Sequence, residues 1–104
     1  KFKPHNIEYN GIFFRSKQEV AVAKIIDKNR IKWEYESKAF KLKKDCYYIP
    51  DFELPEYNCW LEVKPTANPK ALKKFYLFQK KYDIFLFTKN TKKIEFLNWL
   101  IEVE

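Results

Sequence analysis

A chain of 104 residues suits a single domain, 1–104, and buries about two thirds of its unfolded surface without needing a disulfide or structural metal. Its 46% hydrophobic and 34% charged residues exclude a disordered chain. The formal net charge of +7 comes mostly from lysine, so it favours a polyanionic partner, nucleic acid before others.

The sequence also excludes a membrane-spanning or secreted protein. No apolar run approaches the ~18 residues of a membrane span and no signal peptide is visible, so we expect no membrane partner. The two cysteines, Cys46 and Cys59, lie too far apart in the hairpin register given below for a disulfide, whose limit is about 7 Å. We therefore expect a cytoplasmic protein. The sequence starts at Lys1 and not at methionine, which leaves open that it is processed or cut from a larger protein.

The first third of the chain predicts a hairpin and then a helix. After an arm over residues 1–6, an Asn-Gly pair interrupts the apolar segment 7–14, which is the strongest short hairpin signal. The sequence Ser-Lys-Gln-Glu at 16–19 has the form of a capping box and opens a helix that ends at residue 28 or 29. Glu19 falls on the apolar face of this helix, so two roles stay open: it closes the cap, or it points a carboxylate into a site.

The middle of the chain predicts strands. Apolar residues alternate over 31–36, and an extended stretch through Phe40 and Leu42 leads into a turn at 43–45. Residues 48–65 then form the main hairpin, with a turn at 55–58 and a second strand over 59–64.

The register of this main hairpin follows from pairing Leu54 with Cys59. Asp51 then lies opposite Glu62, and Lys64 follows two residues later on the same face. Acidic residues are disfavoured in strands, and like charges directly opposed destabilise a pair. A divalent cation is the simplest counter-charge.

The last third predicts a helix from Asn68 and Pro69 to about Tyr82, an apolar strand over 83–88, and a final helix over 91–103. The expected core face of the first of these helices is Ala71, Leu72, Phe75, Phe78 and Tyr82. That of the last helix is Ile94, Leu97 and Ile101. The whole order predicts an α/β to α+β fold, with a mixed central sheet flanked by helices.

The candidate site residues share a chemistry. Asp51, Glu62 and Glu19 offer hard oxygen ligands, which suit Mg²⁺, and Mn²⁺ as its substitute. Lys64 is placed to hold a water or to stabilise negative charge on a phosphate. The pattern favours hydrolysis of a phosphodiester. The alternative is a solvated hairpin face on which Lys64 only pairs with a carboxylate.

These residues also carry a resemblance. Pro50-Asp51, then ten residues, then Glu62-Val63-Lys64 resembles the motif of the PD-(D/E)xK nuclease superfamily. The stretches GIFFRSKQE, WEYE, PDF and LEVKP are most similar to small phage and prokaryotic members, among them Holliday-junction resolvases and nuclease subunits of transposons. The chain departs from many members in the Pro-Thr pair after the lysine, where some carry glutamine.

The resemblance implies a restriction-endonuclease-like core of order α-β-β-β-α-β, with the N-terminal hairpin and C-terminal helix added. It implies Glu19, Asp51, Glu62 and Lys64 as catalytic residues. It implies metal ligation by Asp51, Glu62, the Val63 carbonyl and Glu19. It favours DNA over RNA as substrate.

Basic residues around this motif are candidates for phosphate contacts. They are Arg15, Lys43, Lys44, Lys70, Lys73 and Lys74. We expect Trp60 to cover the site from below, and Tyr35 and Glu36 to be structural. His5 has no expected role beyond contact with DNA.

Three hypotheses follow. The first is a Mg²⁺-dependent endonuclease specific for branched DNA, such as a Holliday junction, acting as a homodimer because junction cleavage needs two coordinated cuts. The second is a sequence-specific restriction, homing or transposon-type nuclease module. The third is a non-catalytic nucleic-acid-binding domain on a nuclease fold.

Overall fold

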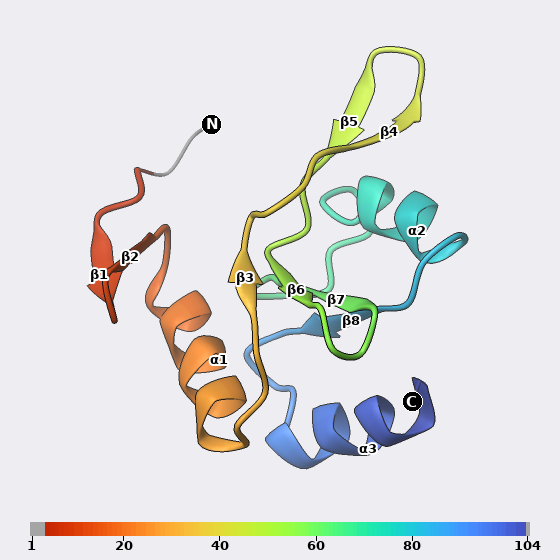
Figure 1. The fold of residues 1–104 in the computed structure, drawn as a ribbon. Coiled ribbons are helices and arrows are strands. Elements are labelled where there is room, and N and C mark those ends of the chain that lie inside the picture. Colours follow the sequence, from red (N-terminus) through yellow and green to blue (C-terminus); the bar gives the residue numbers. More distant parts are fainter. Residues whose placement is uncertain (1–3, 104) are drawn as a thin grey trace.

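The structure, a computed structural model, describes residues 4–103, and Figure 1 shows how their helices and strands are arranged. In chain order the elements are β1 (Ile7–Tyr9), β2 (Ile12–Phe14), α1 (Lys17–Lys28), β3 (Glu34–Tyr35), β4 (Phe40–Lys43), β5 (Cys46–Tyr48), β6 (Phe52–Leu54), β7 (Cys59–Val63), α2 (Lys73–Gln79), β8 (Ile84–Phe87) and α3 (Lys93–Val103). Without the hairpins β1–β2 and β4–β5, the order from α1 to β8 is the expected α-β-β-β-α-β, and α3 follows it. The chain is an α+β domain.

The central sheet is mixed, with strand order β3-β6-β7-β8. β3 pairs antiparallel with β6, β6 pairs antiparallel with β7, and β7 pairs parallel with β8. A parallel pair needs a crossover connection, and α2 lies in the one between β7 and β8. The other two pairs of strands, β1–β2 and β4–β5, form separate hairpins.

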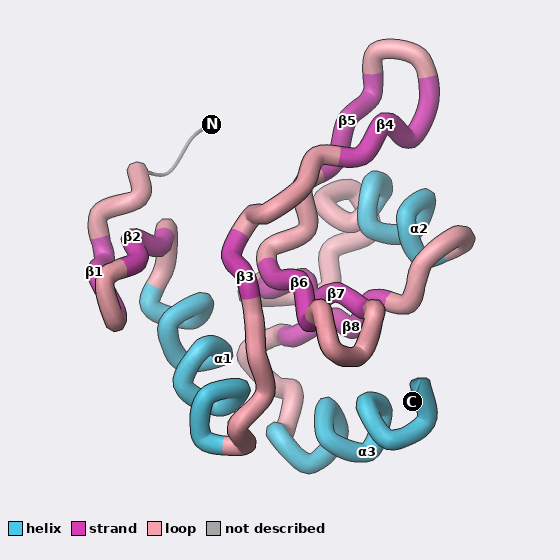
Figure 2. Tube along the Cα trace, in the orientation of Figure 1, coloured by secondary structure: helices cyan, strands magenta, loops and turns pink. Residues whose placement is uncertain are grey.

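Helices cover both faces of the sheet (Figures 1 and 2). α1 and α3 share one apolar cluster with the strands, and α2 shares a second cluster on the opposite side. All five residues of β7 are buried, as expected for a strand covered on both faces. Its neighbouring side chains enter different clusters, Leu61 the first and Trp60 the second. Trp60 is therefore a core residue, with only 6% of its surface exposed.

The N-terminal hairpin and the first helix confirm their predictions. Asn10 and Gly11 form the two-residue loop and both have positive φ, 55° and 83°, as the favoured hairpin turn requires. Ser16 caps α1 by accepting the N–H of Glu19, whose side chain closes the box. Residues 1–3 of the expected arm lie outside the described residues.

The main hairpin has the predicted register, but it is shorter. Phe52 pairs with Leu61 and Leu54 with Cys59, while β6 begins only at Phe52. The expected ladder pairs before that residue, Asp51 with Glu62 among them, are absent from the described structure. Pro50 has no N–H for a ladder bond, and the Asp51 side chain takes the N–H of Val63 instead.

Residues 40–48 contain the turn predicted at 43–45, but this turn closes a separate hairpin, whereas the prediction was an extended stretch leading into the main hairpin. β4 and β5 pair with each other, Phe40 opposite Tyr48, through a turn in which Asp45 has a φ of 56°. Phe40 and Leu42 lie against the cluster under α2, so this helix, not the sheet, covers the apolar side of the hairpin.

The helix predicted from Pro69 to Tyr82 is shorter, Lys73–Gln79. Asn68 does accept backbone N–H groups as predicted, those of Lys70 and Ala71, but the bonds close a turn before the helix. Of the expected core face, Leu72, Phe75 and Phe78 are buried, while Ala71 and Tyr82 are exposed.

The final helix was predicted in the right place but with the wrong buried face. Phe96 and Leu100 are buried, whereas Ile94 and Ile101 are 55% and 69% exposed, and only Leu97 of the predicted face packs, half-buried, against the core. The ring of Phe96 packs against Phe85 and Phe87 of β8, which fixes the rotation of α3.

Two further expectations concern cysteines and membranes. Both cysteines are free, as predicted, and burial raises the pKa of Cys59 to about 12. No helix within residues 4–103 has the length and apolar character that crossing a bilayer requires.

Candidate active site

Asp51 lies at the bend before β6, where three strands come together. Its carbonyl accepts the N–H of Glu36 from the end of β3 at 2.9 Å. Its carboxylate oxygen Oδ2 accepts the N–H of Val63 from β7 at 2.7 Å. Backbone on two sides therefore fixes this aspartate, and the carbonyl of Val63 lies on the same strand edge as its N–H.

Glu19 combines the two roles that the sequence left open. Its oxygen Oε1 accepts the N–H groups of Arg15 at 2.9 Å and Ser16 at 3.1 Å, which closes the helix cap. The same oxygen accepts the hydroxyl of Tyr35 at 3.1 Å. The side chain is buried, with 5% exposed, and it lies beside Asp51, so the capping glutamate is also a site carboxylate.

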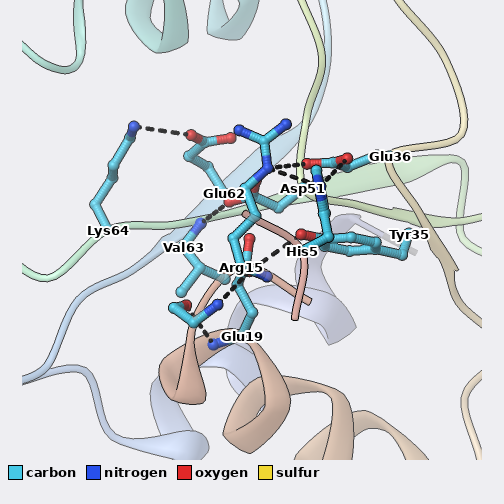
Figure 3. A network of polar contacts seen from close by, with 10 residues as sticks. His5, Arg15, Glu19, Tyr35, Glu36, Asp51, Glu62, Val63 and Lys64 are labelled. Carbon is cyan, nitrogen blue, oxygen red and sulfur yellow. Dashed lines mark hydrogen bonds and ion pairs between the residues drawn. The ribbon is translucent and has the colours of Figure 1, made fainter. Parts of the chain in front are cut away.

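Glu36 joins these two carboxylates. One oxygen each from Glu19, Glu36 and Asp51 lies within 4.8 Å of the others, the one such acidic group in residues 4–103. Glu36 follows β3 in a left-handed conformation, with a φ of 49°. Its oxygen Oε2 lies 3.1 Å from Arg15 Nε, and Oε1 lies 3.0 Å from His5 Nε2 (Figure 3).

Glu62 and Lys64 form the other half of the site. The Tyr48 hydroxyl donates to Glu62 Oε1 at 2.6 Å, and Lys64 Nζ lies 3.6 Å from Glu62 Oε2. Gln18 of α1 donates its side-chain N–H to the carbonyl of Lys64 at 3.0 Å, so it ties the first helix to the end of β7. Figure 3 shows Lys64 extending away from the Glu19 side of the site, toward Glu62.

Burial dominates the electrostatics. Burial first, and then the charge of Glu62, raises the pKa of Asp51 well above its usual range, against smaller opposing effects of the Val63 N–H and Lys64. Burial also raises the pKa of Glu62, while the Tyr48 hydroxyl and Lys64 partly oppose it. Burial and the charges of Glu19 and Glu36 raise the pKa of Tyr35, and burial and the charge of Glu62 raise the pKa of Tyr48, so both hydroxyls stay proton donors.

A divalent cation fits this arrangement. Three carboxylate groups converge within 4.8 Å, and oxygen donors of this kind suit Mg²⁺ or Mn²⁺. The buried acids Asp51 and Glu62 are costly to ionise without a nearby positive charge, and within residues 4–103 the only ion pair that either of them forms is that of Glu62 with Lys64. Of the predicted ligands, Glu19 and Asp51 belong to the close group, whereas Glu62 lies beside it with its oxygens turned to Tyr48 and Lys64.

The acids open into a cleft of about 320 Å³. Its polar lining includes Arg15, Glu36, Asp51, Glu62, Lys64 and Lys74. Of the predicted phosphate contacts, Arg15 and Lys74 therefore line the same cleft as these carboxylates. Lys43, Lys70 and Lys73 line a separate groove together with Lys74, and Lys44 is exposed at the tip of the β4–β5 hairpin.

The sequence prediction missed Glu36, Tyr48, Gln18 and His5 as parts of the site. Glu36 was detectable in principle. Had the strand over 31–36 been paired antiparallel with the strand containing Asp51, the pairing of Tyr35 with Phe52 would have placed the two acids opposite each other. The contacts of Tyr48 and Gln18 join distant segments and leave no local pattern in the sequence.

No protein-family model, no curated protein and no solved structure matches this chain. Any functional assignment therefore depends on the residues and geometry of the cleft itself.

Proposed function

We propose that this protein is a metal-dependent DNA endonuclease that hydrolyses phosphodiester bonds, with branched DNA such as a Holliday junction as its substrate. The observation that carries the proposal is the convergence of Glu19, Glu36 and Asp51 within 4.8 Å, beside a cleft that Glu36, Asp51, Glu62 and Lys64 line together. The element order and mixed sheet support a restriction-endonuclease-like core, and the PD-(D/E)xK resemblance supports the same activity.

The carboxylates of Glu19, Glu36 and Asp51 are the residues that would hold the cation, with Glu62 and the Val63 carbonyl next to them. When bound, Mg²⁺ supplies Lewis-acid polarisation of the phosphate and acidifies a water. Glu36 would hold such an ion beside its contact with Arg15, and the Arg15 guanidinium, which lines the cleft, would pair with a substrate phosphate.

Lys64 carries the remaining role. Its ammonium, held near Glu62 at 3.6 Å, is placed to donate to the attacking water or to a phosphate oxygen as negative charge builds up. Tyr48 and Gln18 are positioning residues, since the first orients Glu62 and the second fixes the backbone of Lys64. Together these two contacts hold the Glu62 carboxylate and the Lys64 ammonium in fixed positions relative to each other.

The test is cleavage of labelled four-way junction, flap and plain duplex DNA, with Mg²⁺ and with EDTA. We expect Mg²⁺-dependent cutting of branched DNA and a loss of about 100- to 1,000-fold in Lys64→Ala, the scale for losing one transition-state donor. Lys93→Ala, on the exposed start of α3, is the matched control. No cutting of any substrate, or equal cutting by Lys64→Ala, would overturn the proposal.

A further inference from the structure

Between α2 and the β4–β5 hairpin lies a groove of about 610 Å³, larger than the carboxylate cleft. Its lining includes five lysines and one exposed aromatic residue: Lys43, Lys70, Lys73, Lys74, Lys80 and Tyr76. We propose that this groove binds single-stranded DNA and leads it into the carboxylate cleft. The proposal rests on the proposed function only for the cutting that follows, not for the binding.

The charge of the groove is uncompensated. No acidic side chain is among its lining residues, and none of its lysines forms an ion pair within residues 4–103. On α1, by contrast, lysines alternate with Glu19 and Asp27. A concave surface that carries only positive charges attracts a polyanion and raises its local concentration.

The groove also has an aromatic and apolar component that phosphate binding alone does not need. Lys73, Tyr76, Leu77 and Lys80 follow the i, i+3, i+4, i+7 spacing, so one side of α2 presents both charge and apolar surface. The Tyr76 ring is 46% exposed. Lysines that follow a backbone, with aromatic rings on which bases stack, are the usual composition of a single-strand site.

Duplex DNA is the poorer occupant because its bases already stack on one another and offer only their edges in the grooves. A single strand offers its base faces to Tyr76. Tyr47, 55% exposed, lines the neighbouring carboxylate cleft and provides a second ring at its entrance.

The groove and the cleft are joined. Lys74 and Ala71 line both, and Lys74 Nζ donates to the carbonyl of Tyr47 at 2.9 Å, which ties α2 to β5 at the junction. A strand bound along the lysines therefore ends beside the cleft that Asp51 and Glu62 line. Among branched DNAs, those with a single-stranded segment next to the cut, such as a flap or fork, should then be preferred over a fully paired four-way junction.

The experiment measures fluorescence anisotropy of labelled oligothymidylate and of a hairpin duplex of equal length, with the full chain in EDTA. We expect Tyr76→Ala to weaken binding of the single strand by about 5- to 150-fold, the range for one base–aromatic stack, and to leave duplex binding unchanged. Tyr76→Phe keeps the ring and should bind like the wild type. Phe13→Ala, which removes a 55% exposed ring from the β1–β2 hairpin, is the matched control.

Equal weakening of duplex and single strand by Tyr76→Ala, or no weakening at all, would overturn the proposal. Tighter binding of oligouridylate than of oligothymidylate would overturn its commitment to DNA. Because binding is measured without metal, loss of cleavage with intact Tyr76-dependent binding would contradict the nuclease proposal alone. Cleavage without such binding would contradict this one alone.

Discussion

The carboxylate cleft and the lysine groove lie side by side but hold their charges in different ways. In the cleft, Asp51, Glu19 and Glu62 are fixed by hydrogen bonds from the backbone and from tyrosine hydroxyls, and burial raises the pKa of Asp51 and Glu62. In the groove, four of the five ammonium groups have no hydrogen-bond or ion-pair partner among residues 4–103, and all five lysines are exposed.

This difference separates two tasks. Buried charges in fixed positions suit catalysis, because the reaction depends on the placement of atoms to within a fraction of an ångström. Exposed charges on long side chains suit binding to the DNA phosphate backbone, because the affinity depends mainly on how many phosphates are neutralised. Mutations in the cleft should therefore affect cleavage far more than binding, and mutations in the groove should do the reverse.

The largest expected effect is that of Asp51→Asn. We expect cleavage to fall about 1,000-fold or more, because Lewis-acid stabilisation is worth several kcal/mol and each 1.4 kcal/mol is about tenfold in rate. The amide still accepts the N–H of Val63, so the fold and the binding of DNA should persist. Cleavage rates and anisotropy on the same labelled junction measure the two effects.

Glu53→Gln is the control for Asp51→Asn. Glu53 is a half-buried acid of β6 that pairs with Ser37 and Lys38, outside the cleft. A large loss of cleavage in this control, or a loss of DNA binding in Asp51→Asn, would contradict the assignment of catalysis to the cleft and of DNA binding to the groove.

Glu36→Gln tests the acid that the sequence prediction left as structural. We expect cleavage and Mn²⁺ affinity to fall about 10- to 100-fold, the scale found for residues that support a metal site. Isothermal titration calorimetry with Mn²⁺ measures the affinity directly. Unchanged Mn²⁺ affinity together with full cleavage would show that Glu36 serves only to bind Arg15 and His5.

The stability of the metal-free protein should depend on pH with a definite sign. Because the pKa values of Asp51 and Glu62 are raised, the folded protein keeps protons that the unfolded chain has lost. Stability is then full below the unfolded pKa values, about 4, and falls as pH rises toward the raised folded values. The expected result is a Tm in EDTA that drops as pH rises above about 4, the ordinary pKa of these acids.

Thermal unfolding followed by circular dichroism measures this dependence. Mg²⁺ should raise Tm most at the upper end of the range, since it binds the ionised acids. Asp51→Asn should flatten the curve, while Glu53→Gln should leave it unchanged. The same slope in both variants would place the titrating groups elsewhere.

The smallest expected effects are those of single groove lysines. Lys70→Gln or Lys73→Gln should weaken DNA binding of every sequence alike and lower the slope of log affinity against log salt by about 1. Cleavage at saturating DNA should stay the same. Anisotropy at several salt concentrations gives the slope, and Lys93→Gln serves as control. A groove variant that cuts slowly even when saturated would mean that groove and cleft act as one site.

Local patterns in the sequence were sufficient for several parts of the fold. The Asn-Gly pair, the capping box and the turn at 55–58 each specify a short-range geometry, and the register of β6 and β7 follows from the last of them. The α+β class and the grouping of Asp51, Glu62 and Lys64 in one cleft were predictable for the same reason.

What could not be predicted depends on contacts between distant segments. Glu36 approaches Asp51 because β3 pairs with β6, and the inserted hairpin β4–β5 hides that pairing in the sequence. The groove exists because that hairpin packs beside α2. The buried face of α3 was mispredicted because its rotation is fixed by rings on β8.

The left-handed backbone conformation of Glu36 is unusual for a residue of its size. Of the five residues other than glycine with positive φ in residues 4–103, three are asparagine or aspartate, which tolerate it, but position 36 holds a long acid. A left-handed conformation costs such a residue about 1–2 kcal/mol. Glycine there would remove this cost, but it would also remove the contacts of Glu36 with Arg15 and His5, so the polar contacts of the side chain, and not the backbone, favour glutamate at this position.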